Sequence, residues 1–139
     1  MSASGAVAVV SGDGRERRQY ERFALDLEII AWSNRDPRTK LYGRTLNISQ
    51  GGLLFTSIAN FRIGQIIAVC LEYEHVCRLE KKGQVLRKVA TNPIEGSNSE
   101  VELNLHTYAF QFTTPMQSME VQNFVHGLPR PSATLEHRL

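Results

Sequence analysis

The sequence predicts a mainly β domain, an antiparallel barrel or sandwich with one helix near its C-terminal end. Three observations lead to this class. From Leu25 onward the chain consists of short apolar runs separated by turn residues, about six such runs occur, and a single later segment has helical periodicity. The length of 139 residues suits one domain. An alternating βαβ fold is disfavoured because helical segments do not separate the runs.

Each predicted strand is a short apolar run bounded by turn residues. In the first run Leu25, Leu27, Ile29 and Ala31 share one face. The fifth run is either two pieces around Lys82 or one long bent strand with a bulge, and residues 91–100 after it are expected to form a loop. The six runs span residues 25–32, 41–49, 53–58, 63–73, 77–89 and 101–113.

The helical segment is predicted over residues 116–128. Its apolar positions follow the i, i+3, i+4, i+7 spacing of one helix face, and Gly127 is a suitable stop. Met116 and Met119 fall outside this apolar face. We expect the helix to cover one opening of the barrel. The face consists of Val121, Phe124, Val125 and Leu128.

The chain ends are expected to be tails around a domain of residues 15–128. Residues 1–14 are small and rich in Gly and Ser, which predicts a flexible segment, and residues 129–139 are polar. No apolar run reaches the roughly 20 residues of a membrane helix, and none at the start resembles a signal peptide. The sequence therefore predicts a cytoplasmic protein, with no membrane insertion and with Cys70 and Cys77 as reduced thiols.

The charge balance excludes a generally basic surface. Sixteen Lys and Arg against 14 Asp and Glu give a net charge of +2, too small to predict general nucleic-acid binding. Twelve of the basic residues are Arg, the side chain that suits bidentate recognition of phosphate. Four lie within eight residues near the N-terminus: Arg15, Arg17, Arg18 and Arg22.

The first candidate motif is the pair Arg18 and Arg22. Their spacing of four places both on one side of a helical turn, and the even offset does the same in an extended segment. Two guanidinium groups can therefore converge on one anion. The alternative is a solvated basic patch.

The second candidate motif is the segment Asn47–Gly52, where one predicted strand ends and the next begins. Asn47 and Ser49 have the same parity, so their polar side chains point the same way. Gly51 and Gly52 permit positive φ angles and close approach of a ligand to the backbone. The alternative is an ordinary polar hairpin turn.

Together the two motifs resemble the PilZ domain family, whose hallmark is RxxxR followed by [D/N]xSxxG. Here these are Arg18 to Arg22 and Asn47 to Gly52, and the resemblance continues through the later strands and the helix over residues 15–128. It implies a six-stranded antiparallel β-barrel with one C-terminal α-helix. It also implies a receptor for the bacterial second messenger cyclic di-GMP, not an enzyme, that needs no cofactor or metal.

The resemblance also assigns roles to residues. Arg18 and Arg22 clamp phosphates and stack on guanine, and Asn47 and Ser49 hydrogen-bond the nucleotide. Gly52, next to Gly51, keeps the turn open. A basic residue at the position of Arg17 is associated in the family with binding of a paired ligand, although a solvated side chain is equally compatible with the sequence. Lower-ranked candidates for ligand contact are Arg15 and Arg87.

Further implications concern the arm and the output. By family analogy the N-terminal arm folds over the nucleotide, and the signal passes to a separate protein of the motility, pilus or exopolysaccharide machinery. Ala109 departs from the glycine common in the family, and its methyl group is expected to crowd the strand or the barrel. Arg87 stands where relatives place a residue against guanine, or else faces solvent.

Other classes of function remain as alternatives. A single-stranded RNA-binding barrel and a module that binds only protein would both use the same arginines. A zinc site at His75 and Cys77 lacks a second closely spaced ligand pair. Ser49 lacks the GxSxG context of a hydrolase.

Overall fold

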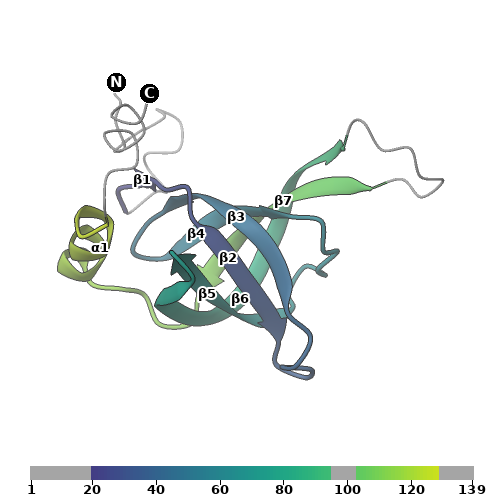
Figure 1. Ribbon diagram of the computed structural model, residues 1–139, viewed down its shortest axis with the longest axis horizontal. Coiled ribbons are helices and arrows are strands. Elements are labelled where there is room, and N and C mark those ends of the chain that lie inside the picture. Colours follow the sequence, from purple (N-terminus) through teal and green to yellow (C-terminus); the bar gives the residue numbers. More distant parts are fainter. Residues whose placement is uncertain (1–19, 95–102, 129–139) are drawn as a thin grey trace.

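The computed structural model describes residues 20–94 and 103–128 (Figure 1). The tails predicted over residues 1–14 and 129–139 lie outside the described residues. The elements follow in chain order as β1 (Phe23–Ala24), β2 (Glu28–Ser33), β3 (Leu41–Ile48), β4 (Gly52–Ser57), β5 (Ile66–Tyr73), β6 (Val76–Pro93), β7 (Asn104–Phe112) and α1 (Ser118–His126).

The strands close into a six-stranded antiparallel barrel. Their order is β1-β3-β2-β5-β6-β7-β4, and the additional pairing of β3 with β4 joins the two ends of the sheet. β1 is a two-residue addition to β3. The predicted six-stranded barrel with one C-terminal helix is therefore confirmed, and the sandwich alternative is excluded.

The barrel interior is filled by the apolar side chains that alternate along each strand. Leu25, Leu27, Ile29 and Ala31 are all buried, as their shared parity predicts. Ring-to-ring contacts join Phe55 to Phe61, Tyr108 and Phe110 inside the barrel. Burying such a side chain contributes about 1.5–3 kcal/mol, so this alternation is the main sequence determinant of the barrel.

β6 is one long strand with bulges, the second of the two predicted alternatives. Its register against β7 shifts between Val85 and Arg87 and again between Lys88 and Ala90. The strand continues through Pro93, so the loop predicted from residue 91 starts later than expected. Pairing with β7 extends the strand, and the resulting hairpin projects beyond the barrel wall (Figure 1). Residues 95–100 of that loop lie outside the described residues.

Cys70 and Cys77 form a disulfide, so the prediction of two reduced thiols is wrong. The prediction followed from the expected compartment and did not consider pairing of the two runs, 63–73 and 77–89, that contain the cysteines. The chain reverses between these runs at Glu74 and His75, which have φ angles of 55° and 65°. Cys70 therefore lies on β5 and Cys77 on β6, where it faces Glu72. Their Cα atoms are 5.8 Å apart, within the range that a disulfide can bridge.

The helix α1 packs its predicted face on the core. Val121 is buried, and Phe124, Val125 and Leu128 contact the core cluster from its edge. Gly127 is the C-cap, as predicted, and the N-terminal turn is fixed by the Gln117 backbone N–H, which donates to Glu120 Oε1 at 2.7 Å.

Met116 is buried although it lies off the helix face, because it precedes the first turn of α1. Among the described residues, no helix has both the length and the apolar character needed to cross a membrane.

Candidate functional site

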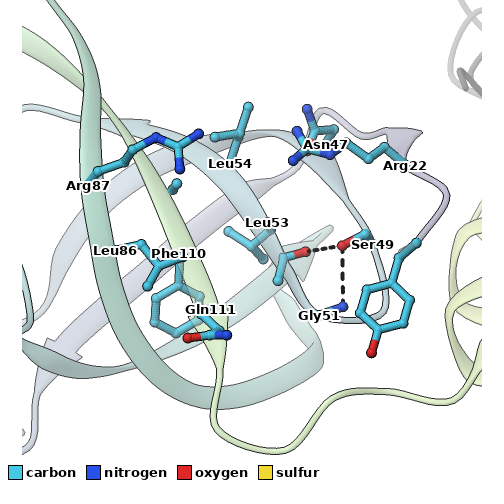
Figure 2. A pocket seen from close by; sticks show the side chains of 13 residues that line it. Arg22, Asn47, Ser49, Gly51, Leu53, Leu54, Leu86, Arg87, Phe110 and Gln111 are labelled. Atoms are coloured by element: carbon cyan, nitrogen blue, oxygen red, sulfur yellow. Dashed lines mark hydrogen bonds between the residues drawn. The ribbon is translucent and has the colours of Figure 1, made fainter. Parts of the chain in front are cut away.

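A hollow of about 250 Å³ lies on the outer wall of the barrel (Figure 2). It forms where the segment entering β1 meets the β3–β4 turn, with β6 and β7 on the far side. We call this hollow the motif pocket. Its lining residues are Tyr20, Arg22, Asn47, Ser49, Gly51, Gly52, Leu53, Leu54, Leu86, Arg87, Ala109, Phe110 and Gln111.

Strand pairing brings Arg22 and Ser49 into this pocket together. Phe23 pairs with Ile48 in antiparallel register, so the preceding residue Arg22 lies beside the following residue Ser49. The buried Thr45 hydroxyl fixes the adjoining chain, because it donates to Leu25 O at 2.8 Å and accepts from Leu27 N at 2.9 Å. Arg22, the member of the first motif that the structure describes, therefore lies in one pocket with Asn47 and Ser49 of the second.

The β3–β4 turn is held by its own hydrogen bonds. Ser49 N donates to Gly52 O at 2.8 Å, and Gly51 N donates to Ser49 Oγ at 3.3 Å. Gln50 anchors the turn to the segment before α1, since its backbone oxygen accepts from Met116 N at 2.8 Å. Ser49 thus shapes the turn, in addition to presenting its hydroxyl group at the pocket (Figure 2).

Gly51 and Gly52 serve close packing, and neither adopts the positive φ angle that glycine permits. Among the described glycines only Gly64 has a positive φ. A Cβ atom on Gly52 would meet the backbone oxygen of Phe110, because β4 and β7 approach closely there. A Cβ on Gly51 would come within 3.0 Å of the Tyr20 ring.

The pocket combines positive charge with polar and apolar groups. Arg22 and Arg87 lie on opposite sides of Leu54 (Figure 2), and the described lining contains no acidic side chain. Within the described part of the chain, the side chains of Asn47 and Arg87 form no hydrogen bond or ion pair with other residues. Leu54 and Ala109 are paired across β4 and β7 and form an apolar floor together with Leu86.

Ala109 does not crowd the barrel. Its neighbours Tyr108 and Phe110 point inward, so Ala109 faces outward and its methyl group lies on the pocket floor. Arg87 also faces outward and lines the pocket, while its side chain is exposed.

Three predicted site residues, Arg15, Arg17 and Arg18, lie outside the described residues. Sequence reasoning in turn missed seven residues of the lining: Tyr20, Leu53, Leu54, Leu86, Ala109, Phe110 and Gln111. Strand parity could have indicated one of them, because an outward Gly52 implies an outward Leu54. Tyr20 depends on the approach of the segment before β1, and Leu86 and Gln111 depend on the register of β6 and β7.

The pocket suits an anionic ligand with a flat apolar part. Guanidinium groups bind phosphate and also stack on aromatic rings, and the leucine floor can cover one face of a ring. Within residues 20–94 and 103–128, no three His, Cys, Asp or Glu side chains are grouped as metal ligands. The fold and the site together define a small β-barrel with a cationic pocket on its outer wall.

The comparisons with known proteins identify the family. The chain matches the model of the PilZ domain over residues 16–126, and it belongs to that family. Its structure is similar to the PilZ domain with c-di-GMP of YcgR from Escherichia coli, with a TM-score of 0.61 and 14% sequence identity over 88% of this chain and 99% of that chain.

A second solved structure is that of the Bacillus subtilis inhibitor of motility, MotI/DgrA. Its TM-score is 0.48 and its sequence identity is 19%, over 79% of this chain and 48% of that chain. A search of curated proteins finds no match.

Proposed function

We propose that this protein is a receptor for cyclic di-GMP and binds it in the motif pocket. The observation that carries the proposal is the meeting of Arg22 with Asn47 and Ser49 in one hollow of a PilZ domain. The solved YcgR domain, which has the same fold, was obtained with c-di-GMP. The proposed contact residues are Arg17, Arg18, Arg22, Asn47, Ser49, Gly51 and Gly52, with Arg15 and Arg87 as further candidates.

The chemistry of the ligand matches the lining. Cyclic di-GMP carries two phosphates and two purines, so its receptor must offset charge and also cover flat rings. A charge-assisted hydrogen bond contributes about 1.5–3 kcal/mol and stacking of a cation on a ring about 0.5–2 kcal/mol. Arg22 and Arg87 can supply both from opposite sides of the Leu54 floor, and Asn47 can add a neutral hydrogen bond.

Titration calorimetry with cyclic di-GMP tests the proposal. We expect binding to the full chain and a loss of affinity of about a hundredfold, or roughly 2.7 kcal/mol, in Arg22→Ala, because a phosphate then lacks its charged donor. Arg62→Ala is the matched control, since Arg62 is exposed and lies outside the pocket. The absence of binding to the unaltered protein would refute the proposal.

The two alternative functions have their own outcomes in the same experiment. Tighter binding of a single-stranded RNA than of cyclic di-GMP would favour the RNA-binding barrel. Equal nucleotide affinity in Arg18→Ala, Arg22→Ala and the unaltered protein would favour a module that binds only protein.

The stoichiometry of this titration decides the role proposed for Arg17. A third cation beside Arg18 and Arg22 can offset the charge of a second ligand molecule, which predicts two nucleotides per chain. One nucleotide per chain would exclude a paired ligand.

We further propose that the segment around the arginine pair docks on the bound nucleotide. The physical reason is that the phosphates of the bound ligand offer charge-assisted hydrogen bonds to the guanidinium groups of this segment. Hydrogen exchange in residues 15–24 should then slow at saturating cyclic di-GMP, while exchange in the core strand β5 stays unchanged. Unaltered exchange in residues 15–24 would contradict the proposal.

The remaining parts of the proposal concern output and location. A binding domain without catalytic chemistry signals through another protein, and by family analogy this is a protein of the motility, pilus or exopolysaccharide machinery.

We place the receptor in the cytoplasm, where disulfides are uncommon. The Cys70–Cys77 bond links residues only seven apart within a hydrogen-bonded hairpin, so we expect the barrel to persist when this bond is reduced.

A further inference from the structure

A second hollow of the barrel wall shares no lining residue with the motif pocket. It measures about 820 Å³ and is bordered by β2, β3, the end of β4, the end of β5 and the start of β7. We call it the outer groove. Its lining residues are Glu28, Ile30, Tyr42, Gly43, Arg44, Thr56, Ser57, Ile58, Glu72, His75 and Leu105.

An apolar row crosses the strands along this groove. Ile30 pairs with Tyr42 across β2 and β3, and the registers of β3 with β4 and of β4 with β7 continue the row through Ile58 to Leu105. Tyr42 is 65% exposed and Ile58 55% exposed, although both are large apolar side chains. Contiguous exposed apolar side chains of this kind mark interaction surfaces.

The row continues onto the projecting β6–β7 hairpin. Leu103 and Ile94 are joined by a backbone hydrogen bond of 2.9 Å, in which Ile94 N donates to Leu103 O, and both side chains are exposed. Leu103 immediately precedes β7 and lies two residues before Leu105, which in extended chain places the two side chains on the same side. The apolar surface is therefore longer than the groove itself and is extended along the hairpin.

A charged row lies next to the apolar one and has an excess of acidic groups. Glu28 pairs directly with Glu72 across β2 and β5, an arrangement in which two like charges repel. Arg44 contacts Asp26 at 2.8 Å and Glu28 at 4.0 Å, so it is already engaged by acidic groups. Within the described residues Glu72 has no basic partner. The edge of the groove is thus locally acidic on a chain whose net charge is +2.

We propose that the outer groove docks an extended segment of a partner protein in which apolar side chains alternate with Lys or Arg. The apolar side chains would cover the Tyr42–Ile58 row, and a cation would lie between Glu28 and Glu72 and relieve their repulsion. A second copy of this chain fits less well. A two-fold axis through the groove would bring a second pair of the same glutamates into the interface.

A peptide titration tests this docking site on the full chain. The probe is a fluorescein-labelled short peptide of alternating Leu and Lys, compared with one of alternating Leu and Glu, and binding is followed by fluorescence anisotropy. We expect the basic peptide to bind at least about tenfold more tightly than the acidic one. Ile58→Ser should weaken binding of the basic peptide about tenfold. The control is Ile63→Ser, which should not weaken binding because Ile63 is 58% exposed but lies outside the groove.

A charge variant tests the second half of the proposal. The double substitution Glu28→Gln with Glu72→Gln should reduce the preference for the basic peptide, whereas Glu21→Gln with Glu80→Gln should leave it unchanged. Equal binding of both peptides, no binding of either, or equal effects of Ile58→Ser and Ile63→Ser would overturn the proposal. So would self-association of the unaltered chain that Ile58→Ser abolishes, because the occupant would then be a second copy.

The test is separate from that of ligand binding. Ile58→Ser should retain the cyclic di-GMP titration of the unaltered chain, because Ile58 is not part of the motif pocket. A failure of the nucleotide titration would leave the peptide result interpretable, and the reverse also holds.

Discussion

Gly51 and Gly52 are adjacent, yet the structure requires a small residue at each for a different reason. At Gly52 the obstacle to a side chain is the Phe110 backbone of a paired strand, which cannot move without opening the sheet. At Gly51 it is the ring of Tyr20, a side chain that can rotate away. Gly51 therefore leaves room for Tyr20 and so helps to position the segment before β1. Gly52 allows β4 and β7 to approach closely, which closes the barrel.

Alanine substitutions should separate these two roles. Gly52→Ala should lower the free energy of unfolding by about 1–3 kcal/mol, the usual cost of overpacking, or more if β4 and β7 separate. Gly51→Ala should unfold at nearly the same denaturant concentration as the unaltered chain. It should lower cyclic di-GMP affinity about tenfold, because displacing Tyr20 also displaces Arg22 two residues later.

Denaturant unfolding and calorimetry on both variants measure these effects. Equal destabilisation by the two substitutions would show that Tyr20 cannot rotate away. Unchanged nucleotide affinity in Gly51→Ala would show that Tyr20 does not position the arginine.

At the scale of elements, the β6–β7 hairpin contains a buried histidine near the base of its projecting part. His106 pairs with Thr91 across the two strands, and their side chains are 3.0 Å apart from Nδ1 to Oγ1. Burial, with a smaller contribution from the nearby Lys88 charge, lowers the pKa of His106 below its ordinary value. The folded hairpin therefore favours neutral His106.

Stability should consequently decrease in mild acid. Because the pKa of His106 is lower in the folded state, the unfolded chain binds a proton first, and the free energy of unfolding falls as the pH drops below about 6.5 towards the lowered pKa. His106→Asn keeps a hydrogen-bonding group near Thr91 and should flatten this part of the pH profile. The control substitution His75→Asn, at an exposed position, should leave the decrease of the unfolding free energy in mild acid unchanged. Denaturant titrations at a series of pH values would reveal the difference, and identical profiles for His106→Asn and the unaltered chain would contradict it.

At the scale of the whole molecule, the motif pocket and the outer groove occupy neighbouring stretches of one wall. Leu54 lines the pocket and Thr56, two residues further along the same face of β4, lines the groove. β7 likewise contributes Ala109 to one and Leu105 to the other. A ligand in the pocket and a partner in the groove would thus contact the same two strands, which gives a direct structural route for any coupling between them.

Local patterns in the sequence determined most of the fold. Alternation at Leu25, Leu27 and Ile29 predicted which side chains at the start of the barrel are buried, and the i, i+3, i+4 spacing predicted the helix. Both patterns depend only on local geometry. Local patterns did not indicate the Cys70–Cys77 disulfide. It depends on the pairing of β5 with β6 after the chain reverses at two residues with positive φ angles.

The sequence alone also determined the motif residues that the pocket gathers, since Arg22, Asn47 and Ser49 can be recognised by type and spacing. Only the tertiary structure decided what stands opposite them. Leu86 and Arg87 reach the pocket through the register of β6 on β7, and the apolar row of the outer groove exists because four strands align in one closed wall. Such registers depend on pairing between distant segments, and no local pattern in the chain specifies them.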